Sequence, residues 1–525
     1  MGTQESNFES AHTLRGRPYR QPVTDTLTIS HALERSAKVW GDRPAISTQA
    51  APEGSRSVSF AEIHRHSARM LTWMREQAGV NEGDVVAVAP QNNVTSIVAV
   101  LALLRGGNPV LLVGPTDPRA RVTEQMGAVS ARQLFRAGPT DAPDAADLPH
   151  VDSLTDVMWP RAEIDPWADA LYIGTSGSTA ESKIVAQSAY NAAVNAAGLA
   201  RHHAIRPGDR ILGCLPIHHV NGLHFTVLGS LAAGAHVLLL DGFDPFGYVR
   251  SCQSFRPRLA SVVPSVLQVL LDSWRMTTSS IGLEYFVSAA APLTSRTAAA
   301  VMDRMGVRVM QGYGLTETTN FATTIPIGLS ETAYRAMMIE TDYPSVGVAF
   351  ADNEVAILRP DGALARPGEE GELSIRGHNI MNGYTGNQSA TSEAFAHGWF
   401  HSGDLGFRYR EPSTGNWFHA ITGRSKNVAK VGGIGVSLDE VDRVLRSHPG
   451  VRDAGTIRVP HRLLGEEIIM FVALQGSMKI SDVRDHLSAH FAPNIARSRL
   501  EELHEIPRTL TGKLIRQDLV SILGL

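Results

Sequence analysis

Short apolar segments alternate with helical segments from about residue 28 to residue 320, and this alternation limits the folds that the chain can adopt. The segments DVVAVAP (84–90) and NPVLLV (108–113) are typical of strands that are buried on both faces. Between them, SIVAVLALLRGG (96–107) is typical of an apolar helix that ends at a glycine pair. Repeated strand–helix–strand units predict an α/β fold in which helices flank parallel sheets on both faces.

The pattern changes after about residue 340, and the change predicts how the chain divides into domains. Short, turn-rich, alternating segments between about 340 and 424 predict a β-barrel-like subdomain at the end of a large N-terminal domain, residues 26–424. Residues 425–525 are enough for a small α+β domain joined by a hinge, with a helix in SLDEVDRVLRSHPG (437–450). The first 25 residues, 1–25, predict a flexible N-terminal arm.

The composition excludes several classes of protein. The chain has 525 residues and a net charge of −4, so it has no basic excess of the kind that binds nucleic acid or an anionic membrane. No apolar run approaches the roughly 18 residues that a membrane-spanning helix needs. The only two cysteines, Cys214 and Cys252, exclude a disulfide scaffold and predict a cytoplasmic location.

The segment GTSGSTAESKI (174–184) is the first candidate for a binding site. Thr175 and Ser176 supply hydroxyl donors, Lys183 supplies a mobile positive charge, and a strand pattern precedes the segment. A glycine-containing turn between a strand and a helix presents backbone N–H groups to phosphate oxygens. The segment does not match G-x-x-x-x-G-K-[ST], so a P-loop hydrolase is not predicted, and taken alone the segment could equally be a surface turn.

Taken with the rest of the chain, this loop resembles the TSGTTGxPKG signature of the adenylate-forming superfamily, which includes acyl-CoA synthetases, amino-acid adenylation domains and luciferases. QGYGLTET (311–318) closely resembles the most diagnostic motif of that family, and SAAAPL (288–293), which contains Ala290, resembles its adenine-side strand and turn. The resemblance covers about residues 30–520. Further segments match in the family's order: PIHHVNG (216–222), GELSIRG (371–377), MNGYTGN (381–387), GWFHSGDLG (398–406), GRSKNVAKVGG (423–433) and PRTLTGKLIR (507–516).

The resemblance implies an acyl-CoA ligase that works in two steps. A carboxylic acid would attack the α-phosphate of ATP to give an acyl-adenylate and pyrophosphate, and the thiol of coenzyme A would then displace AMP. The carboxylate is already anionic, so the first step needs no general base. It needs Mg²⁺ and cationic side chains that neutralise charge around phosphorus. The resemblance also implies that the small C-terminal domain is mobile and rotates between the two steps.

The resemblance assigns roles in the first step to individual residues. Tyr313 would stack on the adenine, on the side where Ala290 also lies. Thr316 would hydrogen-bond the α-phosphate and Glu317 would hold Mg²⁺. The ribose hydroxyls would be bound by Asp404 and Arg424. Each of these side chains could instead have a packing or surface role, and it is the ordered set of motifs that favours the functional interpretation.

Other residues would serve the transfer of the acyl group. Lys513 would bridge the carboxylate and the α-phosphate during adenylation and would leave when the small domain rotates. Lys426 occupies the hinge position. Gly432 and Gly433 would then come to the site and let the pantetheine arm pass close to the backbone. His219 matches a family position that gates the thiol channel, although a packed histidine is the alternative.

The phosphate loop departs from the family signature at three positions. Ala180, Ser182 and Ile184 stand where the signature has glycine, proline and glycine. An alanine that must adopt positive φ costs about 1 kcal/mol or more, and Ile184 adds a stiff side chain beside the lysine. A second hypothesis therefore stays open, in which the chain performs only thioester formation and takes a preformed acyl-adenylate from a partner adenylating enzyme. The retention of Lys513 favours the complete reaction.

Two other classes of protein fit the sequence less well. A catalytically inactive nucleotide-binding or acyl-binding protein has little reason to keep Glu317 and Lys513. An amino-acid adenylation domain that serves a carrier protein should carry an acidic anchor for the amino group, which is not evident. The sequence does not identify the acid or the oligomeric state.

Overall fold

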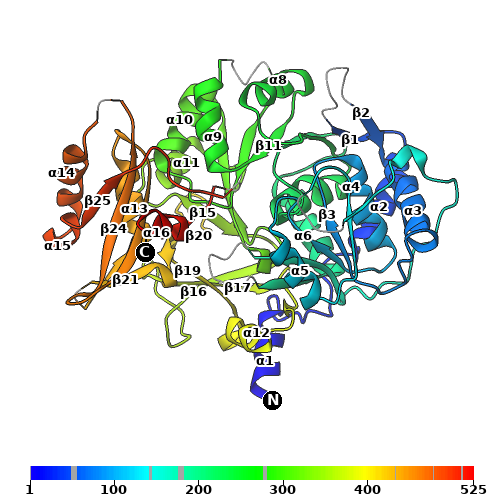
Figure 1. The fold of residues 1–525 in the computed structure, drawn as a ribbon, viewed down its shortest axis with the longest axis horizontal. Helices are drawn as coiled ribbons and strands as arrows, with labels where there is room; N and C mark the ends of the chain where they lie inside the picture. Colours follow the sequence, from blue (N-terminus) through cyan, green and yellow to red (C-terminus); the bar gives the residue numbers. More distant parts are fainter. Residues whose placement is uncertain are drawn as a thin grey trace.

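The structure, a computed structural model, describes residues 2–48, 56–140, 145–175, 183–275, 281–431, 433–476, 478–509 and 512–524. Two sheets with their helices form the large domain, and a third sheet forms the C-terminal domain (Figure 1). The prediction of an α/β protein with a separate small domain is confirmed.

Seven described strands form the first sheet of the large domain. The central strand β3 runs parallel to β4 and β5, because a helix returns the chain after each strand. At one end of the sheet, β8 is antiparallel to both β7 and β18. The order is β18 (Gly383–Tyr384), β8 (Ile184–Ser188), β7 (Asp169–Gly174), β4 (Val110–Leu112), β3 (Val86–Ala89), β5 (Gln133–Arg136) and β6 (Ala146–Asp147).

Thirteen described strands form the second sheet, which contains the β-rich segment that follows residue 340. Strand β15 pairs with β14 on one edge and with β20 on the other, so no edge of β15 is left to pair with β16. The predicted barrel is therefore an open antiparallel extension of the large sheet. The order is β16 (Asn353–Leu358), β17 (Gly371–Gly377), β19 (Phe400–Arg410), β20 (Trp417–Arg424), β15 (Ser345–Ala349), β14 (Thr323–Thr324), β13 (Arg308–Tyr313), β12 (Tyr285–Ser288), β11 (Leu259–Val262), β9 (Arg210–Gly213), β10 (His236–Leu239), β1 (Pro44–Thr48) and β2 (Arg56–Ser59).

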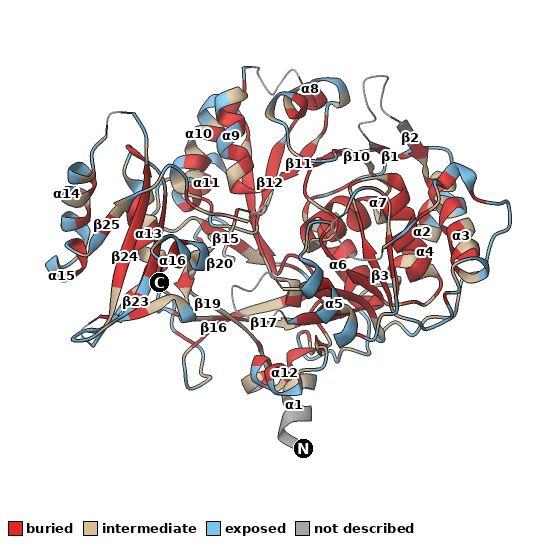
Figure 2. Cartoon of the chain, in the orientation of Figure 1, coloured by how far each residue is buried: buried red, intermediate tan, exposed pale blue. Residues whose placement is uncertain are grey.

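One hydrophobic core is shared by the two sheets. Helix α4 (Val94–Arg105) is buried along its length up to the last residue, as its uniformly apolar sequence predicts (Figure 2). Helix α3 (Phe60–Glu76) begins with the predicted capping box between Ser59 and Glu62. The other helices that contribute to this core are α2 (Ile29–Trp40), α6 (Ala189–His202), the π-helix η2 (Asn221–Gly229) and α7 (Ser230–Ala232).

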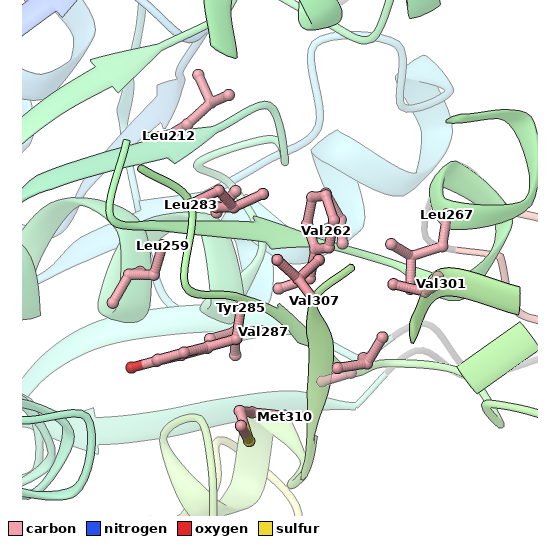
Figure 3. Packing of buried hydrophobic residues seen from close by; sticks show 14 of the residues in the cluster. Leu212, Leu259, Val262, Leu267, Leu283, Tyr285, Val287, Val301, Val307 and Met310 are labelled. Carbon is pink, nitrogen blue, oxygen red and sulfur yellow. The ribbon is translucent and has the colours of Figure 1, made fainter. Parts of the chain in front are cut away.

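A second core lies around the parallel strands of the large sheet. Figure 3 shows part of it, with Val262 of β11, Leu267 of α9 (Pro264–Ser273) and Val301 of α10 (Ser295–Met305) in one cluster. Helix α5 (Arg119–Ala128) contributes Val122 to a smaller cluster with strands of the first sheet. Further α-helices among the described residues of the large domain are α8 (Pro245–Phe255), α9 (Pro264–Ser273), α10 (Ser295–Met305), α11 (Glu331–Met338) and α12 (Gln388–Ala394).

The C-terminal domain is a five-stranded sheet with helices on both faces. Helices α13 (Leu438–Ser447) and α14 (Ile480–His490) share one core with the sheet, and α16 (Arg516–Ile522) shares another. Its strands are β22 (Ile434–Ser437), β21 (Val428–Val431), β24 (Gly465–Leu474), β23 (Val451–His461) and β25 (Arg499–Glu502), and α15 (Pro493–Ala496) precedes β25. No described helix of the chain is long and apolar enough to cross a membrane.

The N-terminal segment differs from the prediction of a flexible arm. It begins with helix α1 (Gly2–Ala11), and Phe8 packs edge-on against Phe395 at a centroid distance of 5.3 Å. His12 is 1% exposed, and its Nε2 lies 2.9 Å from the carbonyl oxygen of Met381. Further along, the hydroxyls of Tyr19 and Ser188 are 2.7 Å apart. These aromatic and polar contacts fix the segment to the large domain, and the sequence pattern alone did not indicate them.

We expect the replacement of His12 by alanine to lower the free energy of unfolding by about 2 kcal/mol, because a buried ring and its hydrogen bond to the domain are lost. Urea unfolding followed by circular dichroism measures the change. The matched control is His31→Ala, since His31 is exposed, and this change should be close to neutral. Equal free energies of unfolding for His12→Ala and His31→Ala would show that the contacts of His12 do not stabilise the fold.

Candidate active site

The end of β13 carries the residues of the diagnostic motif. After Tyr313, a glycine leads into one turn of 3₁₀-helix, η4 (Thr316–Thr318), and a Cβ on that Gly314 would overlap the carbonyl oxygen of Asn320. Glu317 is 9% exposed, and its Oε1 accepts a hydrogen bond of 2.8 Å from the hydroxyl of Tyr384. The motif therefore presents one oriented carboxylate at the end of a parallel strand, where α/β sheets commonly bind ligands.

Three of the predicted nucleotide-binding residues contact one another. The Asp404 carboxylate accepts hydrogen bonds from the Tyr313 hydroxyl, at 2.8 Å on Oδ2, and from Nε of Arg424, at 2.7 Å on Oδ1. Asp404 and Arg424 are register partners on β19 and β20, so the antiparallel pairing brings them together. Burial and Asp404 raise the pKa of Tyr313, so its hydroxyl remains a donor. Ala290, which follows β12, has a φ of 73°, an unusual value for a residue with a Cβ.

Lys513 reaches this group of residues from the C-terminal domain. Burial lowers its pKa, Arg424 and Lys426 lower it further, and Glu317 and Asp404 raise it. The same loop contacts the large domain, because a Cβ on Gly512 would lie 3.0 Å from Oγ of Ser265 at the start of α9. The C-terminal loop therefore lies against the large domain, with Lys513 close enough to Glu317 and Asp404 to interact with them electrostatically.

Ion pairs inside the C-terminal domain hold the lysine loop. Arg508 binds Asp453 of β23 at 2.6 Å and also donates to the carbonyl oxygen of Gly512. At the other end of the loop, Arg516 binds Asp442 at 2.9 Å. These ion pairs and this hydrogen bond predict that Lys513 moves together with the C-terminal domain.

The hinge region carries Lys426, an exposed residue that interacts electrostatically with Arg424, Asp404 and Lys183. Lys426 lies in a short 3₁₀ turn, η6 (Ser425–Asn427), and partial burial, Arg424 and Lys183 all lower its pKa. Asp439 accepts a hydrogen bond from the backbone N–H of Arg424 at 2.8 Å. Gly433 is exposed, at the turn between β21 and β22, with a φ of 84°. Gly432 lies outside the described residues, so the predicted path for pantetheine stays a prediction.

The phosphate loop joins two antiparallel strands, and this corrects the predicted strand-to-helix turn. Gly174 of β7 pairs with Ile184 of β8, and the N–H of Thr175 donates to the carbonyl oxygen of Lys183 at 2.9 Å. Ile184 is 4% exposed within the core that α5 shares, so it does not crowd the phosphate side as expected. Ser176, Ala180 and Ser182 lie outside the described residues.

Lys183 and Glu317 are both neighbours of one residue that the sequence analysis did not assign. Nζ of Lys183 lies 4.6 Å from the ring centroid of Tyr384, whose hydroxyl binds Glu317. Burial and Glu317 raise the pKa of Tyr384, so its hydroxyl stays protonated. The matching segment MNGYTGN contains Tyr384, and that segment was the available signal.

Two buried polar side chains, Gln187 and His224, hold the backbone of the diagnostic motif through hydrogen bonds. Nε2 of Gln187 donates to the carbonyl oxygen of Thr316 at 2.7 Å, and Oε1 of Gln187 is 2.8 Å from Nε2 of His224. Nothing in the local sequence around Gln187 or His224 indicated this chain of contacts. It fixes the backbone of Thr316, the residue expected to meet the α-phosphate.

His219 lies on the Lys513 side of the site. Burial lowers its pKa to about 3, with smaller contributions from His218, Lys513 and Arg121. The rings of His218 and His219 are 4.3 Å apart. His219 is therefore a neutral imidazole at neutral pH, suited to packing or hydrogen bonding and unsuited to binding phosphate.

The buried histidines predict an acid-sensitive fold. Burial lowers the pKa of both His219 and His224 to about 3, whereas an unfolded histidine has a pKa near 6.5. The unfolded chain therefore binds more protons below about pH 6.5, and stability falls as the pH decreases towards 3. We expect each histidine to remove about 1 kcal/mol between pH 7 and pH 5.5. Urea unfolding at the two pH values measures this.

The variant His224→Gln keeps a polar side chain and removes one of these groups. It should reduce the difference between the two pH values by about 1 kcal/mol. If the free energy of unfolding changed equally between pH 7 and pH 5.5 in the variant and in the parent protein, His224 would not be a source of the acid sensitivity.

The residues around Glu317 fit a magnesium ion whose other ligands are phosphate oxygens. Mg²⁺ is usually held by one or two carboxylates together with phosphate oxygens. Glu317 is an oriented carboxylate that interacts electrostatically with Lys513 and shares the neighbour Tyr384 with Lys183. The described residues contain no group of three or more His, Cys, Asp or Glu side chains that could hold a metal without phosphates.

Protein-family models match most of the chain. The model described as AMP-binding enzyme matches residues 33–385, and the model described as AMP-binding enzyme C-terminal domain matches residues 440–513. A sulfoacetate–CoA ligase from Cupriavidus necator is 28% identical over 95% of this chain and 98% of that protein. An oxalate–CoA ligase from Arabidopsis thaliana is 27% identical over 94% of this chain and 98% of that protein.

Solved structures are similar over both domains. o-Succinylbenzoate CoA synthetase from Bacillus subtilis, in complex with its acyl-adenylate intermediate, aligns with a TM-score of 0.80 and 25% identity over 93% of this chain and 97% of that chain. A structure of the same synthetase in complex with ATP and magnesium aligns with a TM-score of 0.80 over 93% of this chain and 99% of that chain.

Proposed function

The chain belongs to the AMP-binding enzyme family, and on that premise we propose that it is an acyl-CoA ligase that makes its own acyl-adenylate. The substrates would be ATP, a small carboxylic acid and coenzyme A, and the products an acyl-CoA, AMP and pyrophosphate. The observation that carries the proposal is the position of the loop that holds Lys513. Gly512 approaches Ser265 of the large domain, and Lys513 interacts electrostatically with Glu317 and Asp404 of that domain. A lysine held there serves adenylation more than any later step.

The first step is a displacement at phosphorus that requires no proton transfer. An oxygen of the acid forms a bond to the α-phosphorus while the bond to the β-phosphate oxygen breaks. Lys513 would neutralise both reacting groups, and Thr316 would hydrogen-bond the α-phosphate. Bound Mg²⁺ would neutralise phosphate charge, and Glu317 is the residue that would hold it. Asp404 and Arg424 would orient the ribose.

In the second step the thiol of coenzyme A replaces AMP. The sulfur attacks the acyl carbonyl, the thiol proton passes to solvent, and the bond from carbon to the phosphate oxygen breaks so that AMP leaves. Lys513 would have left with its domain, and the exposed turn at Gly433 would take its place. His219, neutral and beside Lys513, would border the path of the thiol.

The second hypothesis, thioester formation alone from an adenylate supplied by a partner enzyme, has lost one of its three arguments. Ile184 faces a buried core, and only Ala180 and Ser182 still favour that reading. The position of Lys513 favours the complete ligase.

A screen of acids tests the proposed function. The protein is incubated with ATP, Mg²⁺, coenzyme A and one acid at a time, and AMP and thioester are quantified by chromatography and mass spectrometry. Sulfoacetate, oxalate and o-succinylbenzoate come first, because similar proteins are named for them. We expect AMP and thioester in equal amounts with at least one small acid. Thioester from a synthetic acyl-adenylate, without AMP from ATP and the same acid, would support the second hypothesis instead.

A further inference from the structure

Tyr384 lies on the strand that is paired with the end of the phosphate loop. Strand β18 is antiparallel to β8, with Tyr384 opposite Val185. On either side of it, the N–H of Asn382 donates to Ala186 at 2.8 Å and the N–H of Thr385 donates to Ile184 at 2.9 Å. The backbone of Tyr384 is therefore fixed to the strand that begins directly after Lys183.

The side chain of Tyr384 contacts two functional groups at once. Its hydroxyl donates to Oε1 of Glu317 at 2.8 Å, and its ring lies under Nζ of Lys183 at 4.6 Å from the centroid. A ring face attracts a cation at this distance, and a hydroxyl that donates to one carboxylate oxygen restrains the orientation of the carboxylate. One rigid aromatic side chain thus sets the separation between an expected metal ligand and an expected phosphate ligand.

The backbone of Glu317 is held by the same segment that carries Tyr384. The N–H of Met381 donates to the carbonyl oxygen of Glu317 at 2.8 Å, three residues before Tyr384. Since the main chain of Glu317 is already fixed in this way, the hydroxyl of Tyr384 contributes mainly the orientation of the carboxylate. Its loss should change how the carboxylate meets a cation and should leave the fold intact.

We propose that Tyr384 is a positioning residue that holds the carboxylate of Glu317 and the ammonium of Lys183 in register, so that both act on the phosphates of one ATP–metal complex. The proposal rests on the proposed function, because it assigns Tyr384 to the adenylation step. A preorganised pair of this kind raises the rate only where phosphate charge develops. Thioester formation, which begins after pyrophosphate has left, should not depend on it.

The variant Tyr384→Phe separates the two contacts, because it keeps the ring under Lys183 and removes the hydroxyl. We expect the Mg²⁺ concentration for half-maximal pyrophosphate release to rise about 5- to 20-fold. Thioester formation from a synthetic acyl-adenylate and coenzyme A should stay within about twofold of the parent protein. Tyr384→Leu removes both contacts and should in addition weaken ATP binding. Tyr409→Phe, on β19, is the control for loss of a tyrosine hydroxyl elsewhere in the large domain.

A binding measurement keeps the test independent of turnover. Mn²⁺ is titrated in the presence of a non-hydrolysable ATP analogue and followed by electron paramagnetic resonance, and Tyr384→Phe should bind the ion about 5- to 20-fold more weakly. If the parent protein released no pyrophosphate with any acid, the proposed function would fail while this titration still tested the role of Tyr384. Unchanged Mn²⁺ binding and unchanged Mg²⁺ dependence in Tyr384→Phe would overturn the proposal.

A double-mutant cycle excludes a general loss of structure. If Tyr384 acts through Glu317, then Tyr384→Phe should have little further effect on Mn²⁺ binding in the Glu317→Gln background. Additive losses in the double variant would show that Tyr384 acts separately from Glu317 and would also overturn the proposal.

Discussion

Replacing Lys513 by alanine is expected to slow pyrophosphate release from ATP and acid by about 10²- to 10³-fold. The physical reason is that the first step gathers negative charge around the α-phosphorus, and Lys513 is the cation that the C-terminal domain brings to Glu317 and Asp404. The same variant should form thioester from a synthetic acyl-adenylate at a rate within about twofold of the parent protein. Quenched-flow assays of the two half-reactions measure both rates.

The control for this prediction is Lys479→Ala, which removes an exposed lysine before α14 in the same domain. It should leave both half-reactions unchanged. An equal loss in the two half-reactions of Lys513→Ala would contradict a role restricted to adenylation. The result would point instead to damage to the domain or to a lysine that stays in the site throughout.

Replacing Asp404 by alanine is expected to lower the free energy of unfolding by about 3 kcal/mol and to abolish measurable ATP binding. Asp404 is 4% exposed and accepts hydrogen bonds from both Tyr313 and Arg424. Its loss would leave the buried hydroxyl of Tyr313 and the guanidinium of Arg424 without their acceptor. Part of the cost is relieved because the Arg424 side chain is 41% exposed and can reach water.

Urea unfolding and isothermal titration calorimetry with ATP measure the two effects. Asp404→Asn is the matched variant, since it keeps the shape and one acceptor oxygen while removing the charge. It should fall between the parent protein and Asp404→Ala in both measurements. Unfolding energies of Asp404→Ala and the parent within 1 kcal/mol of each other would show that the three-residue contact does not stabilise the fold.

The sequence predicted most of the large domain because its signals are local. The apolar helix at 96–107 and the capping box at Ser59 appear in the structure as expected. The motif residues Tyr313, Asp404 and Arg424 contact one another, as the resemblance to the adenylate-forming family implied. Their roles in binding a nucleotide stay predictions that the variants above test.

The features that the sequence did not predict depend on pairing between distant segments. The contacts of the N-terminal segment were not predicted, because Phe8 and His12 contact Phe395 and Met381, which are far away in the sequence, and no local pattern indicates such contacts. The order of strands in the β-rich segment was not predicted either, because β14 occupies the free edge of β15. Similarly, the pairing of β8 with β7 and β18 determines that the side chain of Ile184 is buried and that Tyr384 contacts Glu317.

The central claim is that one site makes the acyl-adenylate and then uses it. The most direct measurement is the exchange of labelled pyrophosphate into ATP in the presence of Mg²⁺ and an accepted acid, without coenzyme A. The account predicts exchange that depends on the acid and that is lost in Lys513→Ala. Thioester formation from a synthetic acyl-adenylate, with no exchange in the parent protein for any acid that forms that thioester, would contradict it.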